Sequence, residues 1–442
     1  MHSAGTMNQA TNQTTEDLNF TASKFGSANS AQFSSSVRSF CPLAATSTIR
    51  EILTLALLST LLILALAARP ALAQETVLYN FTNTPDGATP NSRLTSDAAG
   101  NLYGTTEYGG LGYGTVFELS PDEGGGYTET VLYTFTGAPD GANPTYSNVI
   151  FDSLGNLYGT TWNGGANGYG TVFELSPVGA SWTESILWNY QNSPDGANPL
   201  NDLIMDAAGN LYTMTYEGGG TAGTVFELSP NGNGGWNGQV IYGVDTDYSG
   251  IAIDALGNLY FSAGNSLYKL VPNGNGGWSA TVIHSFAGGT KDGVNPEGTV
   301  VIDSQGDVYG TTPSGGTKNM GVVYKLSPVL TGKKKGTYTQ KLLYSFKGGK
   351  DGATPYAGIT FDSAGNIYGT TTAGGKSSDG TVFELVAPVG TGAYKEKILA
   401  SFDGTDGSQP YNSLILDSLD NVYGTTVSGG TSNVGVVFEV AP

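Results

Sequence analysis

One phrase recurs seven times along this chain, and it constrains the fold more than any other feature. Each copy contains an Asp, two spacer residues, and then Gly-Asn-Leu-Tyr-Gly-Thr-Thr or a close variant. Successive tyrosines of the phrase are 55, 54, 48, 49, 59 and 55 residues apart, at Tyr103, Tyr158, Tyr212, Tyr260, Tyr309, Tyr368 and Tyr423. A period near fifty residues with strand-like segments in each unit is typical of propellers and solenoids.

Each repeat contains four strand-like segments. In the second repeat, residues 148–152 are a short apolar run, and residues 157–161 are β-branched and aromatic. Residues 171–176 and 184–190 alternate apolar and polar side chains, with Gly-rich or Pro-containing turns between the segments. This pattern predicts an antiparallel meander of four strands. Residues 74–442 show no sustained helical period, so we expect an all-β domain.

The two ends of the repeat region complement each other. Residues 75–81 match a fourth strand that has no first three before it, and residues 435–440 match a third strand with no fourth after it. Pairing these segments would complete the last unit and close a ring, whereas a solenoid would need capping units at both ends. We therefore predict a seven-bladed β-propeller of four-stranded antiparallel blades, in which the N-terminal strand completes the last blade.

The segment before the repeats has a different composition. Residues 1–49 are rich in Ser, Thr, Ala and Asn, and they are expected to be disordered or to precede the true translation start. In residues 50–73, Arg50, an apolar run and Ala71-Leu72-Ala73 form the pattern of a secretory signal cleaved before Gln74. An uncleaved membrane anchor is the alternative. Cleavage would leave a propeller of residues 74–442 that is secreted, periplasmic or on the cell surface, without stable membrane insertion. We expect this propeller to be a monomer.

Charge and composition exclude several classes of function. After residue 73 there are 14 of the 18 basic residues but 34 of the 37 acidic ones, so this region carries a net charge of about −20 and is not expected to bind nucleic acid. The single cysteine, Cys41, precedes the cleavage site, and His284 is the only later histidine. Sites that need cysteines or several histidines are therefore excluded. We predict no metal site and no cofactor.

The repeat phrases also carry a resemblance. Residues 155–161, 170–176 and 139–144 resemble the tandem repeat of the GloVer ("choice-of-anchor") family of exported bacterial proteins, over essentially all of residues 75–442. The Asp-x-x-Gly-Asn-x-Tyr phrase is more loosely similar to NHL-type propellers. The resemblance implies a secreted or surface repeat protein, and it assigns no activity. The C-terminal sorting anchor of some members is not recognisable here, where the sequence ends at Pro442 directly after a strand.

Two recurrent motifs are interpreted as structural. The Asp of each Asp-x-x-Gly-Asn turn is expected to cap the turn, because a calcium loop needs more oxygen ligands. Six of the seven units also contain an Asp-Gly-x-x-Pro loop before the first strand, which suggests a shared role in building the ring. The fourth unit lacks this loop. His284 in that unit replaces an aromatic residue, so a partly packed imidazole is expected.

The candidate binding residues lie where the units differ. After the Thr-Thr pair, units one to three have aromatic, amide and acidic residues, while the other units have small ones. Such side chains suit stacking on sugar rings and hydrogen bonding to hydroxyls. The predicted ligand-binding residues are Tyr108, Trp162, Asn163, Tyr169 and Tyr216. The alternative is that these aromatic side chains only cover thin Gly-rich loops.

These residues predict an exported, non-catalytic binding module, with a cell-surface or environmental glycan as its expected ligand. A carbohydrate-active hydrolase or lyase on the same face is the first alternative. Its carboxylate pair would be Glu107 and Glu217, if the two lie 5–10 Å apart across the substrate. A repetitive surface protein that binds another protein is the second alternative.

Overall fold

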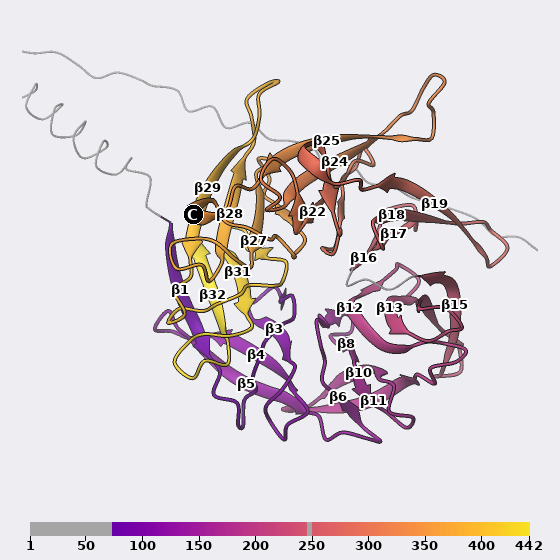
Figure 1. Ribbon diagram of the computed structural model, residues 1–442. Helices are drawn as coiled ribbons and strands as arrows, with labels where there is room; N and C mark the ends of the chain where they lie inside the picture. The colour runs from indigo at the N-terminus through magenta and orange to yellow at the C-terminus, as the bar shows by residue number, and fades with distance from the viewer. Residues whose placement is uncertain (1–72, 245–249) are drawn as a thin grey trace, which may run out of the picture. The chain divides into compact units, whose positions relative to one another are not determined.

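The computed structural model describes residues 73–244 and 250–442. Residues 1–49 and all of the expected signal at 50–73 except Ala73 lie outside the described residues. Within the described part, seven four-stranded antiparallel sheets follow one another around a ring (Figure 1). This confirms the predicted seven-bladed β-propeller. No helix in these two ranges is long and apolar enough to cross a bilayer.

In blades 1 to 6 the strands run outward from the axis of the ring in sequence order, and in blade 7 the outermost strand is β1 (Gln74–Asn80). Blades 1 to 3 consist of β2 (Thr95–Ser96), β3 (Leu102–Thr106), β4 (Thr115–Pro121) and β5 (Tyr127–Thr134); β7 (Ile150–Phe151), β8 (Leu157–Thr161), β10 (Thr171–Val178) and β11 (Ser181–Asn189); and β12 (Ala197–Met205), β13 (Leu211–Glu217), β14 (Gly223–Pro230) and β15 (Trp236–Val244).

Blades 4 to 6 consist of β16 (Ile251–Ile253), β17 (Leu259–Ala263), β18 (Ser266–Pro272) and β19 (Trp278–Ser285); β21 (Val301–Ile302), β22 (Val308–Thr312), β24 (Val322–Pro328) and β25 (Tyr338–Ser345); and β26 (Thr360–Phe361), β27 (Ile367–Thr371), β28 (Thr381–Val386) and β29 (Lys395–Ser401). The seventh blade combines β30 (Ile415–Leu416), β31 (Val422–Thr426), β32 (Val436–Ala441) and β1 (Gln74–Asn80).

The seventh blade confirms the predicted closure. Strand β1 pairs antiparallel with β32, from Gln74 opposite Ala441 to Asn80 opposite Val436. The loops at this joint also bond to each other: the backbone N–H of Thr89 donates to the carbonyl of Val434 at 2.7 Å, and that of Thr431 donates to Asn80 Oδ1 at 2.9 Å. The first and last strands of the described chain therefore share one sheet.

The hydrophobic core lies between neighbouring blades. At six joints within the described residues, the aromatic residue after a fourth strand packs edge-on against an aromatic residue of the third strand in the next blade. Phe81 contacts Phe117 with ring centroids 5.1 Å apart, and Phe135 contacts Phe173 at 5.2 Å. The same contact recurs at four further joints, between Tyr190 and Phe226, Phe286 and Tyr324, Phe346 and Phe383, and Phe402 and Phe438.

Six of the seven first strands have only two or three residues and are shorter than the sequence predicts, whereas β12 in blade 3 has nine. Only β7, at Ile150–Phe151, forms within the expected segment 148–152. Nearer the axis, the backbone N–H of Thr160 donates to the hydroxyl of Ser147 at 2.9 Å instead of to a backbone carbonyl. The side chain thus replaces a ladder bond, and the backbone of residues 146–148 can turn toward the axis.

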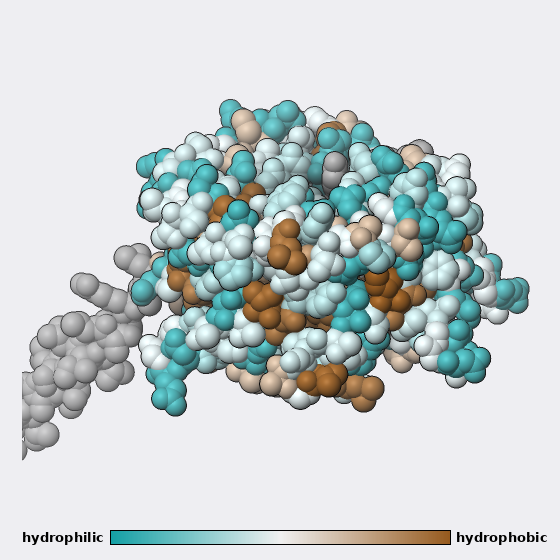
Figure 2. Space-filling model, turned by 90° about the horizontal axis from the view of Figure 1, so that it is seen from below, coloured by the Kyte–Doolittle hydropathy of each residue, from teal (hydrophilic) through white to brown (hydrophobic). Residues whose placement is uncertain are grey.

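Short extra elements decorate one face of the ring. Strands β6 (Gly141–Ala142) and β9 (Asn163–Gly164) pair with each other, as do β20 (Gly293–Val294) and β23 (Ser314–Gly315). Two single-turn 3₁₀ helices, η1 (Gly289–Lys291) and η2 (Gly349–Asp351), lie in the Asp-Gly loops. In the view of Figure 2, apolar residues form separate small patches among polar ones.

Candidate functional site

Two sets of loops meet on the decorated face, which we call the loop face. The Asp-Gly-x-x-Pro loop of a unit pairs with the loop that follows its Thr-Thr pair, as in the bridges Ala88–Tyr108, Ala353–Ala373 and Ser408–Ser428. The predicted binding residues follow the Thr-Thr pairs, so they lie on this face. The Asp-Gly-x-x-Pro loops lead from there toward the axis.

Four of the predicted residues line one cavity, which we call the rim pocket. It is formed by Glu107, Tyr108, Trp162 and Asn163, together with Asn143, Thr145, Tyr146 and Leu200. Tyr108 is 48% exposed, and the Trp162 and Tyr216 ring centroids are 5.3 Å apart. The rim pocket therefore gathers candidate residues of units one and two, while Tyr216 of unit three contacts Trp162 but lines a separate hollow.

The Glu107 carboxylate is fixed in position by hydrogen bonds from neighbouring side chains. It accepts a hydrogen bond of 2.6 Å from the amide of Asn91. Burial raises the pKa of Glu107, while hydrogen bonds from Tyr108, Thr145 and Asn91 act in the opposite direction. A carboxyl group fixed in this way can accept hydrogen bonds from ligand hydroxyls, and it keeps one orientation in doing so.

Glu217 and Tyr169 are not part of the rim pocket. Glu217 lines a separate hollow with Asn192, Ser193 and Tyr216. The structure thus brings Glu107 and Glu217 into no common cavity. Tyr169 is 38% exposed, and its carbonyl accepts the backbone N–H of Asn198 at 2.8 Å. It lines neither the rim pocket nor the pocket described next.

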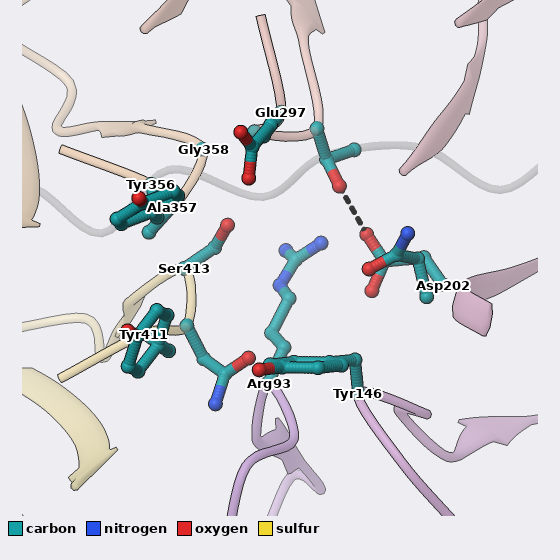
Figure 3. Close-up of a pocket in the computed structure, with 13 residues that line it drawn as sticks. Arg93, Tyr146, Asp202, Glu297, Tyr356, Ala357, Gly358, Tyr411 and Ser413 are labelled. Atoms are coloured by element: carbon teal, nitrogen blue, oxygen red, sulfur yellow. Dashed lines mark hydrogen bonds between the residues drawn. The ribbon is translucent and has the colours of Figure 1, made fainter. Parts of the chain in front are cut away.

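A second cavity lies where the inner segments of the blades converge, and we call it the axial pocket (Figure 3). Its volume is about 320 Å³. The lining comes from the few residues between the loop proline and the first strand of several units. These residues are Arg93, Tyr146, Asn201, Asp202, Glu297, Gly298, Thr299, Tyr356, Ala357, Gly358, Tyr411, Asn412 and Ser413.

Three tyrosines form part of the axial pocket wall. The Tyr356 and Tyr411 rings are 5.3 Å apart, and the Tyr146 and Tyr411 rings are 6.4 Å apart. Burial, and after it the negative charge of Glu297, raises the pKa of both Tyr356 and Tyr411. These phenols therefore stay protonated at neutral pH and can donate hydrogen bonds. Tyr146 lines both cavities, so the axial and rim pockets share one wall residue.

Opposite the tyrosines, a polar contact bridges two blades that are not neighbours. The hydroxyl of Thr299 donates to Asp202 at 2.6 Å, from the segment before β21 to the buried carboxylate in β12. Gly250 lies beneath this contact, since a Cβ built there would be 1.7 Å from the Thr299 hydroxyl. A glycine in the fourth unit thus allows blades 3 and 5 to meet across blade 4.

Arg93 is the charged group at the centre of the axial pocket. Figure 3 shows its side chain pointing into the cavity, with Glu297, Asp202 and the tyrosines around it. No hydrogen bond or ion pair joins its guanidinium to any residue in the described ranges, and no carboxylate there lies within 4 Å of it. The guanidinium donors are therefore directed at the cavity itself.

The recurrent motifs use their acidic groups internally. In the second unit, Asp152 accepts hydrogen bonds from the backbone N–H groups of Leu154 and Asn156 and from the Tyr158 hydroxyl. In the Asp-Gly loops, Asp140 accepts from Tyr133, and His284 contacts Asp292 at 3.3 Å. The structural interpretation of both motifs and of His284 is confirmed. Residues 73–244 and 250–442 contain no group of three or more His, Cys, Asp or Glu placed to hold a metal ion.

None of the predicted site residues lines the axial pocket. Its signal was nevertheless present: Arg93 is the only arginine after residue 69, and Tyr356 and Tyr411 occupy equivalent positions after the loop prolines of units six and seven. The predicted residues lie where the units differ after Thr-Thr, whereas the axial residues lie where the units differ before the first strand. Repeat divergence at that segment is the observation that would have found them.

A family model covers nearly all of the propeller. The Gloeobacter/Verrucomicrobia repeat model matches residues 67–266 and 261–442, so the chain belongs to this family of β-propeller repeat proteins. This agrees with the resemblance seen in the repeat phrases. No curated protein sequence matches the chain.

Solved structures share the fold at low sequence identity. Virginiamycin B lyase from Staphylococcus aureus is 14% identical with a TM-score of 0.50, and the match covers 84% of this chain and 99% of that one. The extracellular domain of a proposed one-component system from B. thetaiotaomicron is 12% identical with a TM-score of 0.50, over 82% of this chain and 39% of that one. A gluconolactonase from Xanthomonas campestris is 15% identical with a TM-score of 0.41, over 85% and 92%. Similarity at this level shows the propeller fold alone.

Proposed function

We propose that the protein is an exported carbohydrate-binding propeller, and that the ligand occupies the loop face from the axial pocket to the rim pocket. One observation carries the proposal: Tyr146 lines both pockets, so aromatic side chains follow one another from the axis to the rim. Tyr356 and Tyr411 lie on the axial side, and Trp162 with Tyr216 on the rim side. Flat rings beside fixed amides and carboxylates offer both contacts that a sugar needs, stacking and hydroxyl bonding.

The polar groups of the two pockets support a neutral hydroxyl-rich ligand in the rim pocket. Glu107 accepts hydrogen bonds, and Asn143 and Asn163 provide both donors and acceptors. The amide of Asn163 contacts the side-chain oxygen of Asn143 at 3.2 Å, which fixes the pair at the mouth of the pocket. Export follows from the expected signal at residues 50–73, which lies outside the described residues except for Ala73.

A glycan array probed with the chain from Gln74 onward tests the proposal. This fragment contains all seven blades, including the strand that closes the ring. We expect binding to a restricted set of saccharides. Trp162→Ala should weaken that binding by about 1–3 kcal/mol, since a large stacked aromatic is lost. Glu123→Gln, in the exposed turn after β4, is the control and should leave affinity unchanged.

The enzyme alternative makes a different prediction for the same surface. Asp202 and Glu297 both line the axial pocket, whereas Glu107 and Glu217 line separate cavities. In a hydrolase or lyase, Glu297→Gln would abolish turnover and leave binding nearly intact, because acid–base catalysis acts in the transition state. Release of new saccharide ends by the wild type would therefore favour an enzyme. If the chain binds no saccharide but binds another protein, the result would favour a repetitive surface protein with a protein partner.

A further inference from the structure

Arg93 is exceptional in both sequence and position. Apart from Arg93, the propeller carries its positive charge on lysines, and its one arginine lines the axial pocket. Its side chain is half-buried, and its guanidinium has no hydrogen-bond or ion-pair partner in residues 73–244 and 250–442. Within the described ranges, folding therefore leaves these donors without an acceptor, which is unusual for an arginine that lines the same cavity as two acids.

The guanidinium group is suited to one kind of ligand group. It is planar, it is always charged, and its forked donors match the two oxygens of a carboxylate. In a partly enclosed cavity such a bidentate bond is stronger than a neutral hydrogen bond. A lysine would offer a point charge without this geometry.

The neighbouring acids restrict the ligand further. Asp202 is buried and accepts the Thr299 hydroxyl, and Glu297 lies near Tyr356 and Tyr411. One cation and two anions line the pocket, and the propeller as a whole is strongly acidic. This negative electrostatic field disfavours a ligand with several negative charges. A ligand with a single carboxylate can place that group against Arg93, and the ligand's hydroxyls can donate to Asp202 and Glu297. The volume of about 320 Å³ is at the lower end for ligand pockets, which suits a terminal sugar unit.

We propose that the axial pocket binds a terminal uronic acid, with the sugar carboxylate on Arg93 and the sugar ring beside Tyr146 and Tyr411. This inference rests on the proposed carbohydrate-binding function, and it names the ligand class for the axial end of that surface. The neutral part of the glycan then continues toward Trp162 in the rim pocket.

Calorimetric titration with two matched probes tests the proposal. Methyl glucuronoside and methyl glucoside differ only by the carboxylate in place of the hydroxymethyl group. The wild-type chain from Gln74 is expected to bind the glucuronoside about 10- to 100-fold more tightly, the range for a charge-assisted hydrogen-bonded pair. Arg93→Gln should remove this preference and leave the affinity for the glucoside unchanged. Arg93→Lys should keep only part of the preference.

The control is Lys291→Gln, which removes an exposed positive charge from η1 on the loop face. It should leave the preference intact, and thermal melting should show each variant folded. Equal wild-type affinity for the two probes, or an unchanged preference in Arg93→Gln, would overturn the uronic acid proposal while the carbohydrate-binding function stands. Absence of saccharide binding in the array, with folded protein, would overturn the proposed function itself.

Discussion

Each residue of the recurrent Leu-Tyr-Gly-Thr-Thr phrase has a separate task. In the first unit, the Tyr103 hydroxyl donates to Asp97 at 3.2 Å, which ties the second strand to its preceding turn. The hydroxyl of Thr105 donates at 2.8 Å to the carbonyl of Ser147 in the next blade. The same inter-blade bond joins Thr311 to Ala357 at 2.6 Å. Thr370 and Thr425 make the corresponding bonds to the carbonyls of Asn412 and Ser92, so the phrase ties four pairs of neighbouring blades together.

The glycine of the phrase makes room for an aromatic ring. Gly159 is buried and lies opposite Phe173 in the β8–β10 ladder, and a Cβ at this position would be 2.6 Å from the Phe173 ring. Similar approaches occur at Gly104, Gly310, Gly369 and Gly424. The role of this glycine is therefore close packing rather than backbone conformation.

We therefore expect Gly159→Ala to lower the stability of the propeller by about 1–3 kcal/mol, the usual cost of overpacking a filled core. Thermal or denaturant unfolding measures the effect. In a Phe173→Leu background the same substitution should cost much less, since the clashing ring is gone, and the two substitutions should be clearly non-additive. Simple additivity would mean that the ring does not require the glycine.

The sequence reveals those site residues that differ between neighbouring repeats, and it does not reveal those that meet only in the folded ring. Glu107, Tyr108, Trp162 and Asn163 were predictable because they lie in neighbouring units and their difference from the later units is visible along the chain. Arg93 and Tyr411 meet only after the ring closes, from opposite ends of the propeller. The separation of Glu107 from Glu217 was also invisible, because the placement of the intervening Trp162 loop depends on the blade geometry.

At the scale of elements, the joints between fourth strands carry an unusual set of glutamates. Glu75, Glu129, Glu184 and Glu396 occupy equivalent positions on β1, β5, β11 and β29, and each has a buried carboxyl oxygen without a hydrogen-bond partner. Each is close to an Asp of an Asp-Gly loop, namely Asp406, Asp86, Asp140 and Asp351.

The fifth blade shows what such a joint requires. There Gln340 occupies the position of the glutamates, and its amide donates to Asp292 at 2.6 Å. A protonated glutamic acid can donate in the same way, whereas a glutamate anion would face another carboxylate. Burial, with the charge of the facing Asp as the next cause, raises the pKa of Glu129, Glu184 and Glu396 to about 7.

The pKa of Glu75 rises to about 8, by burial and by the charges of Asp406 and Asp403. The other groups near these joints are Tyr79 beside Glu129, Tyr133 beside Glu184, and Lys347 beside Glu396, where the lysine lowers the pKa. Because the folded pKa values exceed the ordinary value of 4.5, the folded state binds more protons than the unfolded state between about pH 4.5 and 8.

Stability should therefore fall as the pH rises from 5 to 8. Glu129→Gln and Glu184→Gln should each reduce the dependence of unfolding free energy on pH, by less than about 1.4 kcal/mol per pH unit, the limit for one full proton, since these groups are partly solvated. Denaturant titrations across this pH range measure the slope. Glu123→Gln, in the exposed turn after β4, should leave it unchanged. Because Glu75 and Glu396 still titrate, part of the slope should remain after both substitutions, whereas a slope that neither substitution changes would contradict the proton-sharing joints.

At the scale of the whole molecule, the sequence predicted the architecture because the repeat count and the incomplete end units were both visible. What it could not predict was the length of the inner strands, such as β7, where the Ser147 hydroxyl replaces a ladder partner. That replacement matters for function, because the residues freed from the ladder are the ones that reach the axis and line the axial pocket.

Ring closure depends on a strand from the other end of the chain. Strand β1 covers the edge of β32, its residues Val77 and Tyr79 pack into the joints beside blade 7, and Phe81 beyond it contacts Phe117 in blade 1. A propeller without β1 would expose an unpaired strand edge and lose this burial. Both effects act within blade 7, where β1 and β32 pair although no loop connects them.

Deletion of residues 74–80 should therefore lower the melting temperature markedly and promote association through β32, whereas a chain that begins at Gln74 should melt like the full chain. Thermal melting and light scattering compare the two forms. A synthetic peptide of residues 74–81, added in excess, should restore melting of the shortened chain, because it supplies the missing strand. An unchanged melting temperature after the deletion would show that the other six joints hold the ring without the β1–β32 pairing.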